Sequence, residues 1–270
     1  MEKKMIITLV VVVIAIAAFG GIVYAIMNNQ AQGKAINSVE DLEGARLAVQ
    51  TGTTGDTFVT NNYEKTSKAS VSRYTYYPDA ITDLKNKKVD AIIMDKAVAE
   101  AYVSRNSGIK VLDAKLDENE DSYAFVFKKT NTALRDEFNT ALAELITDGT
   151  IDQINAYWEQ HDDCQAAPFI TETGTGATIK VGTSPDFEPY DGMYGQTYTG
   201  IDMDIVRAIC NKLNYKPSFE GYDFDSIILA VDTSHFDVGA SGFSITPERQ
   251  GQVLFSNSYA SSEQVAVVRA

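Results

Sequence analysis

The sequence predicts an α/β protein of two lobes, and three observations predict it. Short apolar runs alternate with amphipathic segments from residue 36 onward. A break without apolar period interrupts the alternation at 160–177, and the alternation then resumes. The 270 residues, 44% of them hydrophobic and 22% charged, suffice for one large or two modest domains. Strands alternating with helices imply mostly parallel sheets covered by helices.

The first element is an almost unbroken apolar run at 5–27, preceded by two lysines and followed by a polar stretch. Such a run can span a bilayer, and the lysines favour a cytoplasmic N-terminus with the rest of the chain outside. A cleaved signal peptide is the alternative, because Val-Tyr-Ala at 23–25 resembles a cleavage site. Residues 1–33 are therefore expected to form a transmembrane anchor or a signal segment, with an uncleaved anchor favoured.

The next part of the chain, residues 34–112, is expected to form one lobe, called here the N-lobe. Apolar runs predict strands at 45–50, 72–77, 90–94 and 109–112. Amphipathic spacing predicts helices at 54–63, 78–87 and 96–107.

The remainder, residues 113–270, is expected to form the second lobe, the C-lobe, with the linker 160–177 inside it. Its strands are predicted at 122–128, 178–183, 216–222, 236–240 and 264–269. Its helices are predicted at 131–147, 151–158, 200–213, 225–231 and 247–252.

Charge and motif content exclude several classes of function. The formal net charge of -14 argues against nucleic acid or an anionic membrane surface as partners. The chain contains no glycine-rich fingerprint for nucleotides and no paired metal-ligand spacing, so no cofactor and no metal are expected. Its two cysteines, Cys164 and Cys210, can either form one disulfide or remain as buried thiols.

The loop 241–249 is the strongest candidate for a binding site. Arg249 offers a planar charged fork that matches a carboxylate, while Ser241, Ser244 and Thr246 offer hydroxyl and main-chain donors. Gly242 lets a ligand approach the backbone closely. The alternative is an ordinary strand-to-helix connection, with Thr246 as N-cap and Arg249 in a surface ion pair.

Two further strand ends carry polar groups. Gln50, Thr53 and Thr54 belong to a glycine-containing turn before a helix, where free amides bind anions or simply form a common βα turn. Asp95 ends an apolar strand and could meet an ammonium group or cap the following helix. Phe187 and Phe224 could sandwich a flat or apolar part of a ligand, or lie in the core.

Taken together, these strand ends resemble the extracellular solute-binding proteins that deliver polar amino acids to ABC importers. The resemblance covers nearly all of 36–270 and is carried by GTSPDFEPY at 182–190, GIDMD at 200–204, FDVGASGFSITPER at 236–249 and LEGARLAVQTGTT at 42–54. It implies a two-lobe, periplasmic-binding-protein-like (type II) fold. The N-lobe corresponds to the family's lobe 2 and the C-lobe to its lobe 1.

The order of these stretches is reversed relative to the family, so the chain resembles a circular permutant. The linker 160–177 would join the family's old C-terminus to its old N-terminus, which is tolerable where termini lie close together. An excerpt from a tandem array is the alternative. Permutation would leave one covalent crossover between the lobes, and the strand 264–269 is expected to pack beside 122–128.

The resemblance also implies roles for individual residues. Arg249 would grip the α-carboxylate of an amino acid, helped by Ser244 and by the main chain at Gly242 and Thr54, and Asp95 would take the α-ammonium. The side-chain pocket would consist of Phe187, Phe224, Ser184 and Gln50. Family members that bind basic amino acids tend to carry aspartate at the position of Ser184, so a neutral polar ligand fits better.

The function implied is capture of an amino acid between two lobes for ABC-type import, without catalysis. The expected protein is a monomer outside the cytoplasm, with an importer permease as partner and the N-terminal helix in the membrane, or secreted if that helix is cleaved. One alternative is an enzyme resembling cyclohexadienyl dehydratases, with Glu188 or Asp186 as the acid. Another is the extracellular sensor domain of a receptor.

Overall fold

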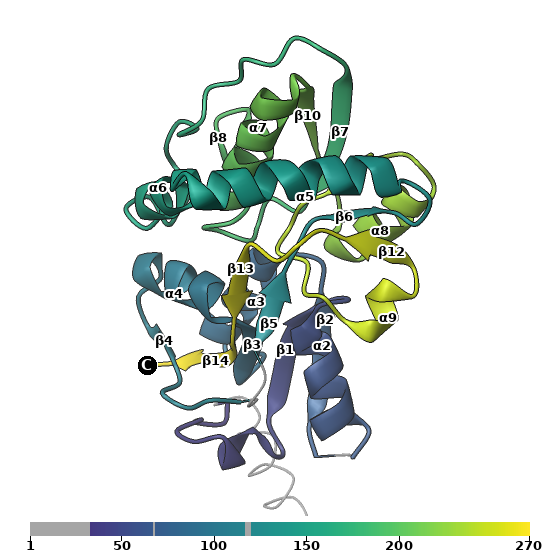
Figure 1. Cartoon of the computed structure of the whole chain (residues 1–270). Helices are drawn as coiled ribbons and strands as arrows, with labels where there is room; N and C mark the ends of the chain where they lie inside the picture. The colour runs from purple at the N-terminus through teal and green to yellow at the C-terminus, as the bar shows by residue number, and fades with distance from the viewer. Residues whose placement is uncertain (1–32, 67, 117–119) are drawn as a thin grey trace, which may run out of the picture.

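The computed structural model describes residues 33–66, 68–116 and 120–270 and confirms a mixed α/β fold of two lobes (Figure 1). Each lobe contains one five-stranded sheet. The anchor or signal segment expected at 1–33 lies, apart from Gly33, outside the described residues. Within the described ranges, no helix combines the length and the apolar character that crossing a membrane requires.

The sheet of the N-lobe has the strand order β2-β1-β3-β14-β4. Its strands are β1 (Arg46–Gln50), β2 (Ser70–Tyr74), β3 (Ala91–Asp95), β4 (Ile109–Val111) and β14 (Gln264–Arg269). β1 runs parallel to β2 and β3, whereas β14 runs antiparallel to β3 and β4. All five residues of β3 are buried, which is typical of an inner strand covered on both faces.

Helices cover both faces of this sheet. They are the 3-10 turn η1 (Glu40–Leu42), α2 (Thr54–Val59) with its π-helical continuation η2 (Thr60–Glu64), α3 (Tyr77–Lys85) and α4 (Lys96–Arg105). In α3, Pro78 stands at the start, where its missing N–H is not needed. Tyr77, Ala80, Ile81 and Leu84 then follow at helical spacing and are buried.

The sheet of the C-lobe has the strand order β10-β7-β11-β6-β12. Its strands are β6 (Val126–Lys128), β7 (Thr178–Thr183), β10 (Lys216–Gly221), β11 (Val238–Gly239) and β12 (Val253–Phe255), and a separate hairpin consists of β8 (Gly192–Tyr194) and β9 (Thr197–Thr199). Its helices are α5 (Thr132–Thr147), α6 (Thr150–Trp158), α7 (Ile201–Leu213), α8 (Phe224–Asp232) and α9 (Pro247–Gln250). The short strands β8, β9 and β12 were not predicted, because three residues carry too little period to be recognised.

The chain crosses between the lobes twice, through the antiparallel pair of β5 (Asp121–Tyr123) and β13 (Ala260–Ser262) (Figure 1). The expectation of a single covalent crossover is therefore wrong. So is the expectation that 264–269 packs beside 122–128, because that strand is β14 and pairs with β3 and β4 of the N-lobe. The segment expected as one strand at 122–128 is divided into β5, in the crossing pair, and β6, in the C-lobe sheet.

The linker 160–177 contains no helix or strand and is fastened along α7. Asp204 accepts hydrogen bonds from the backbone N–H groups of Phe169 (2.9 Å) and Ile170 (3.2 Å) and from Trp158 Nε1 (2.8 Å). Asn211 Oδ1 accepts a further bond from Thr173 N at 2.7 Å. These bonds give the irregular backbone the partners that a strand or helix would otherwise supply.

Both cysteines are free in the structure. Cys164 and Cys210 are buried, so the alternative of buried thiols holds and no disulfide joins the linker to α7. Burial raises the pKa of the Cys210 thiol to about 12. Burial raises the pKa of the Cys164 thiol as well, so both thiols favour the protonated form over the nucleophilic thiolate.

Candidate functional site

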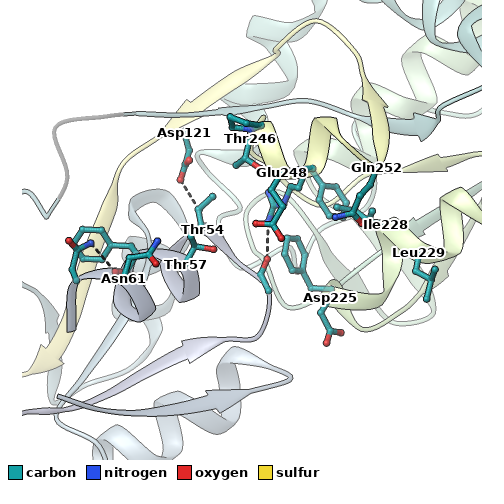
Figure 2. A pocket seen from close by; sticks show the side chains of 17 residues that line it. Thr54, Thr57, Asn61, Asp121, Asp225, Ile228, Leu229, Thr246, Glu248 and Gln252 are labelled. Atoms are coloured by element: carbon teal, nitrogen blue, oxygen red, sulfur yellow. Dashed lines mark hydrogen bonds between the residues drawn. The ribbon is translucent and has the colours of Figure 1, made fainter. Parts of the chain in front are cut away.

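A cavity of about 700 Å³ lies between the lobes. Its N-lobe wall comes from the turn before α2, from α2 and from η2, and its C-lobe wall comes from α8, from Phe243 and from α9 with the residues around it (Figure 2). Asp121, at the start of the crossing strand β5, completes the lining. Of the residues predicted to form a binding site, Arg249, Thr246, Phe224 and Thr54 line this cavity.

Arg249 lies in the junction between the two lobes, where carbonyl oxygens from both lobes accept hydrogen bonds from its guanidinium. Its Nη1 donates to Ser244 O and its Nη2 donates to Gly52 O of the opposite lobe, each at 2.9 Å. The guanidinium lies over the rings of Phe224 and Phe243, with 5.5 Å and 5.7 Å to the centroids. Only 8% of the residue is exposed, and burial lowers its pKa.

The structure confirms Thr246 as the N-cap of α9, but it does not place Arg249 in a surface ion pair. Thr246 is the N-cap, and its hydroxyl accepts a hydrogen bond from Arg249 N at 3.2 Å. Pro247 occupies the first helical turn. Among the ion pairs of the described residues, none contains Arg249, although the charges of Asp121, Asp95 and Glu248 act on it at longer range. A carboxylate is the ligand that such a buried fork lacks.

The turn after β1 places Thr54 at the cavity, whereas Thr53 does not line it. Thr53 is the N-cap of α2, accepting from Asp56 N at 3.1 Å, and its hydroxyl donates to Gln50 O at 2.9 Å. Thr54 Oγ1 donates to Asp121 Oδ2 at 2.8 Å (Figure 2). Thr54 therefore reaches across to the crossing strand, where it faces the cavity.

Asp95 ends β3 and lies in a buried polar cluster next to the cavity lining. It accepts hydrogen bonds from Tyr123 OH at 2.6 Å and from Gln264 Nε2 at 3.0 Å. Burial, with help from nearby Asp121, raises the pKa of Asp95 to about 6, although the two hydrogen bonds oppose the shift. Asp95 occupies the N-cap position of α4 without a capping bond from its side chain, so the simple helix-cap alternative is not what holds it.

Gln264 is a site residue that the sequence did not reveal. Its Nε2 lies 3.1 Å from Thr54 Oγ1, 2.9 Å from Asp121 Oδ2 and 3.0 Å from Asp95 Oδ1, so one amide connects the predicted residues to the crossing strand. Asp121 was missed in the same way. Neither Gln264 nor Asp121 could be identified as a site residue from the sequence, because each begins a strand whose partner strand could not be predicted. No local pattern distinguishes the two residues from surface residues.

The small residues of the loop 241–244 mainly organise the C-lobe. Ser241 Oγ accepts from Ser184 N at 3.2 Å, and Gly242 N donates to the buried Asp202 at 2.9 Å. Gly242 has φ +54, and a Cβ there would collide with the ring of Phe187. Glycine is thus needed at 242 for both backbone conformation and space.

The two aromatic residues predicted to sandwich a ligand lie in different environments. Phe224 lines the cavity and stacks on Phe243 with 4.9 Å between ring centroids. Phe187 is 5% exposed and packs against Tyr77 (6.4 Å) and Tyr123 (6.0 Å). In this arrangement the core alternative describes Phe187, and only Phe224 faces the cavity.

A second buried cluster joins Gln50 and Ser184 through Asp186. Gln50 Nε2 lies 3.1 Å and 3.3 Å from the two oxygens of Asp186, and Ser184 Oγ donates to Asp186 Oδ1 at 2.8 Å. Tyr77 N donates to Asp186 Oδ2 at 2.8 Å. The structure therefore brings Gln50 of the N-lobe and Ser184 of the C-lobe to the same carboxylate, although neither residue lines the cavity.

The described residues contain no group of three or more His, Cys, Asp or Glu side chains arranged to hold a metal ion. The polar groups that line the cavity are instead the Arg249 guanidinium, separated carboxylates and neutral donors. Such a set can bind a small zwitterion at opposite ends.

Comparison with known proteins identifies the same family that the sequence resembles. The family model of bacterial extracellular solute-binding proteins, family 3, matches residues 57–161 and 179–270. The arginine-binding extracellular protein ArtP of Bacillus subtilis is 32% identical over 104 residues, which are 38% of this chain and 40% of ArtP. The glutamine-binding protein GlnH of the same organism is 29% identical over 135 residues, which are 50% of this chain and 48% of GlnH.

Among solved structures, an ancestral arginine-binding protein bound to arginine is 38% identical over 28% of this chain and 34% of its own, with a TM-score of 0.27. The chain thus spans about half or less of the length of each relative named here. The family model, in contrast, matches well over half of the chain, in both lobes. The chain belongs to the bacterial extracellular solute-binding proteins, family 3.

Proposed function

We propose that this protein captures a polar amino acid between its two lobes outside the cytoplasm and passes it to an ABC-type importer. The observation that carries the proposal is the buried guanidinium of Arg249, which contacts both lobes and has no carboxylate partner among the described ion pairs. A ligand's α-carboxylate would supply that partner, and Asp95 would take its α-ammonium. Relatives whose names state arginine, histidine or glutamine binding support an amino acid as the ligand.

The proposed action is binding and lobe closure, with no bond made or broken. Of the two acids suggested for an elimination reaction, Glu188 lies 3.1 Å from Arg105 in an ion pair, and Asp186 accepts hydrogen bonds from three groups. Each acid therefore has a partner that accounts for its burial. We infer a monomeric binding protein whose remaining partner is an importer permease.

A thermal-shift panel of the twenty amino acids on the full chain tests this function. A ligand that binds only the folded state must raise the unfolding temperature, by an amount that grows with ligand concentration. At least one polar amino acid is expected to do so at millimolar concentration. If none of the twenty shifts the transition, the proposed function is wrong.

We also propose that the chain is a circular permutant of its family. The two crossings through β5 and β13, and the position of β14 in the N-lobe sheet, are compatible with a fold whose ends have been moved. Arg269 Nη2 donates to Lys34 O at 2.7 Å, so the two ends of the described chain lie side by side. On this proposal the N-lobe is 34–112 with β14 added, and the C-lobe is the rest.

Rejoining the ends tests the permutation. A chain that starts at residue 178, continues from 270 through a short glycine-serine linker into 34, and ends at 159 restores the family order. It is expected to fold and to bind the same amino acid within about threefold, because every strand keeps its neighbours. An unfolded product would contradict the proposal.

The apolar run at 5–27 supports an anchor that keeps the protein at the outer face of the cell membrane. The intact mass of protein from the membrane fraction decides between retention and cleavage. Retention gives the mass of the full chain, whereas cleavage near residue 25 removes the run and releases the protein.

A further inference from the structure

The two lobes also meet at a second place, away from the cavity that contains Arg249. The end of α4 in the N-lobe contacts the turn after β7 and the linker 160–177, which both belong to the C-lobe. In Figure 1, α4 lies to the left of the crossing strands β5 and β13, whereas α2, α8 and α9 of the cavity wall lie to their right. This second contact, called here the α4 junction, is therefore separated from the cavity by the crossing strands.

An ion pair between the lobes is the main contact of the α4 junction. Arg105 Nη2 of the N-lobe lies 3.1 Å from Glu188 Oε2 of the C-lobe. This Oε2 atom is buried and makes no hydrogen bond in the part of the chain that the structure describes, so the guanidinium of the opposite lobe is the charge that it meets. The guanidinium also lies over the ring of Tyr102, 4.4 Å from its centroid. Removing one partner of such a pair is costly, because a buried charge is left without its counter-ion.

Two further polar contacts accompany this ion pair. Tyr102, which is 4% exposed, donates its hydroxyl hydrogen to Asp186 O at 3.0 Å. Ser104 Oγ lies 3.1 Å from Asp162 Oδ2 in the linker. The last turn of one N-lobe helix thus contacts two separate segments of the C-lobe.

Rotation of one lobe against the other must change the α4 junction. α4 follows β3 of the N-lobe sheet, and Glu188 lies in the turn after β7 of the C-lobe sheet. A rotation that separates Arg249 from Gly52 O therefore also moves α4 relative to that turn. The ion pair is near its optimal length, so movement apart breaks it and movement together produces steric conflict. It is most stable in the arrangement in which both lobes line the cavity.

We propose that Arg105 and Glu188 form a latch that holds the two lobes in the arrangement in which both line the cavity. Neither residue lines the cavity itself, so the latch acts on binding by setting the fraction of molecules whose lobes are together. A ligand that contacts both lobes binds with lower apparent affinity when this fraction falls. The effect on affinity rests on the proposed function, whereas the arrangement of the lobes can be measured without a ligand.

The distance between two spin labels on the full chain tests the latch. The labels are attached at Lys65→Cys, directly after η2, and at Asp232→Cys, at the end of α8, which are exposed positions on different lobes. The native cysteines are buried and remain unlabelled. Arg105→Glu replaces attraction with repulsion between two carboxylates. The ratio of molecules at the wild-type distance to those at other distances should therefore fall at least tenfold.

Exchange of the two charges assigns the effect to this pair. Arg105→Glu combined with Glu188→Arg restores the attraction and should restore the wild-type distances. Lys212→Ala is the matched control and should change nothing, since Lys212 is 31% exposed against 28% for Arg105 and pairs with Glu144 and Asp148 inside the C-lobe.

Three outcomes overturn the latch. The first is an unchanged distance in folded Arg105→Glu, and the second is an equal change in the control. The third is a change that the exchanged pair does not reverse, because the cause then lies outside the pair. If Arg105→Glu does not fold, Arg105→Gln, which removes only the charge, takes its place and is judged in the same way.

Calorimetry on the unlabelled full chain measures the consequence for binding, with glutamine and arginine as probes. Affinity for the probe that the wild type binds should fall at least fivefold in Arg105→Glu and recover in the exchanged pair. Unchanged affinity together with changed distances overturns the role in binding. Failure of both probes to bind the wild type counts against the proposed function, and the label distances then decide the latch on their own.

Discussion

The guanidinium of Arg269 lies 3.1 Å from Oδ1 of Asp90, and this contact joins the last strand of the chain to the segment before β3. Asp90 also accepts from Arg46 Nη2 and from Lys34 N, each at 2.7 Å. Its side chain is 3% exposed. Burial disfavours the ionised carboxylate, but the donors from Arg46, Lys34 and Arg269 outweigh it and lower the pKa of Asp90 to about 2.

Replacing this carboxylate should destabilise the N-lobe. Asp90→Ala removes the one acid that two guanidiniums share and is expected to lower the free energy of unfolding by about 3 kcal/mol. Urea denaturation followed by circular dichroism measures the change. Asp136→Ala is the matched control, because that acid is 65% exposed and should cost less than about 0.5 kcal/mol. Equal effects of the two substitutions would show that burial of Asp90 is unimportant.

The same carboxylate should make stability fall in acid. Because folding lowers its pKa from 3.8 to about 2, its contribution is complete above about pH 4 and is lost as the pH falls through about 2. The urea midpoint of the wild type should therefore decrease over this range. Asp90→Asn should lower the midpoint at pH 5 and decrease less steeply between pH 4 and 2. Parallel curves for the two proteins would contradict the assignment.

The last strand should be among the most protected parts of the N-lobe. β14 pairs with β3 on one side and β4 on the other, and Val267 and Ala266 are fully buried. We expect amide hydrogens at 265–268 to exchange at least a hundredfold more slowly than those of the exposed edge strand β2. Hydrogen exchange read by mass spectrometry measures this. Fast exchange at 265–268 would show that the strand is not an integral part of the sheet.

Ligand affinity should weaken in mild acid. Burial raises the pKa of Asp95 to about 6, and the proposed contact with an α-ammonium needs the ionised form. Affinity should fall up to tenfold per pH unit below about 6, and Asp95→Asn should bind weakly with a flatter profile. The stability of the ligand-free protein should change with pH in the opposite sense to the affinity. Protonated Asp95 stabilises the fold most below about pH 4, and this contribution to the free energy of unfolding is lost as the pH rises through about 6. Calorimetry between pH 5 and 8 tests both proteins, and unchanged wild-type affinity would exclude the role.

Shape as well as charge should matter at Arg249. Arg249→Lys keeps the positive charge but loses the fork that contacts Ser244 O and Gly52 O, so affinity should fall at least tenfold. Arg249→Ala should cost about a hundredfold, in line with loss of a charge-assisted pair worth about 3 kcal/mol. Arg135→Lys, on the surface of α5, is the control and should bind as the wild type does. Normal affinity of folded Arg249→Ala would place the carboxylate site elsewhere.

Local patterns predicted most of the helices and inner strands, and they missed the elements that depend on distant partners. The buried run of β3 and the threonine-proline start of α9 are recognisable because neighbouring residues provide the signal. β5 and β13 are three residues each and exist only because they meet. Asp121 begins β5 and Gln264 begins β14, so neither could be assigned to the site without knowing how these strands pair.

The sequence by itself determined the alternation of strands and helices, the turn that carries Arg249 and the acid that ends β3, because each depends on residues adjacent in the chain. Only the tertiary structure decided that β14 completes the N-lobe, that the chain crosses twice, and that Asp186 faces the Gln50 amide across the junction. The physical reason is the range of the interactions. Apolar period and capping chemistry act over a few residues, whereas strand pairing and a hydrogen bond between residues 136 positions apart depend on how the whole chain folds.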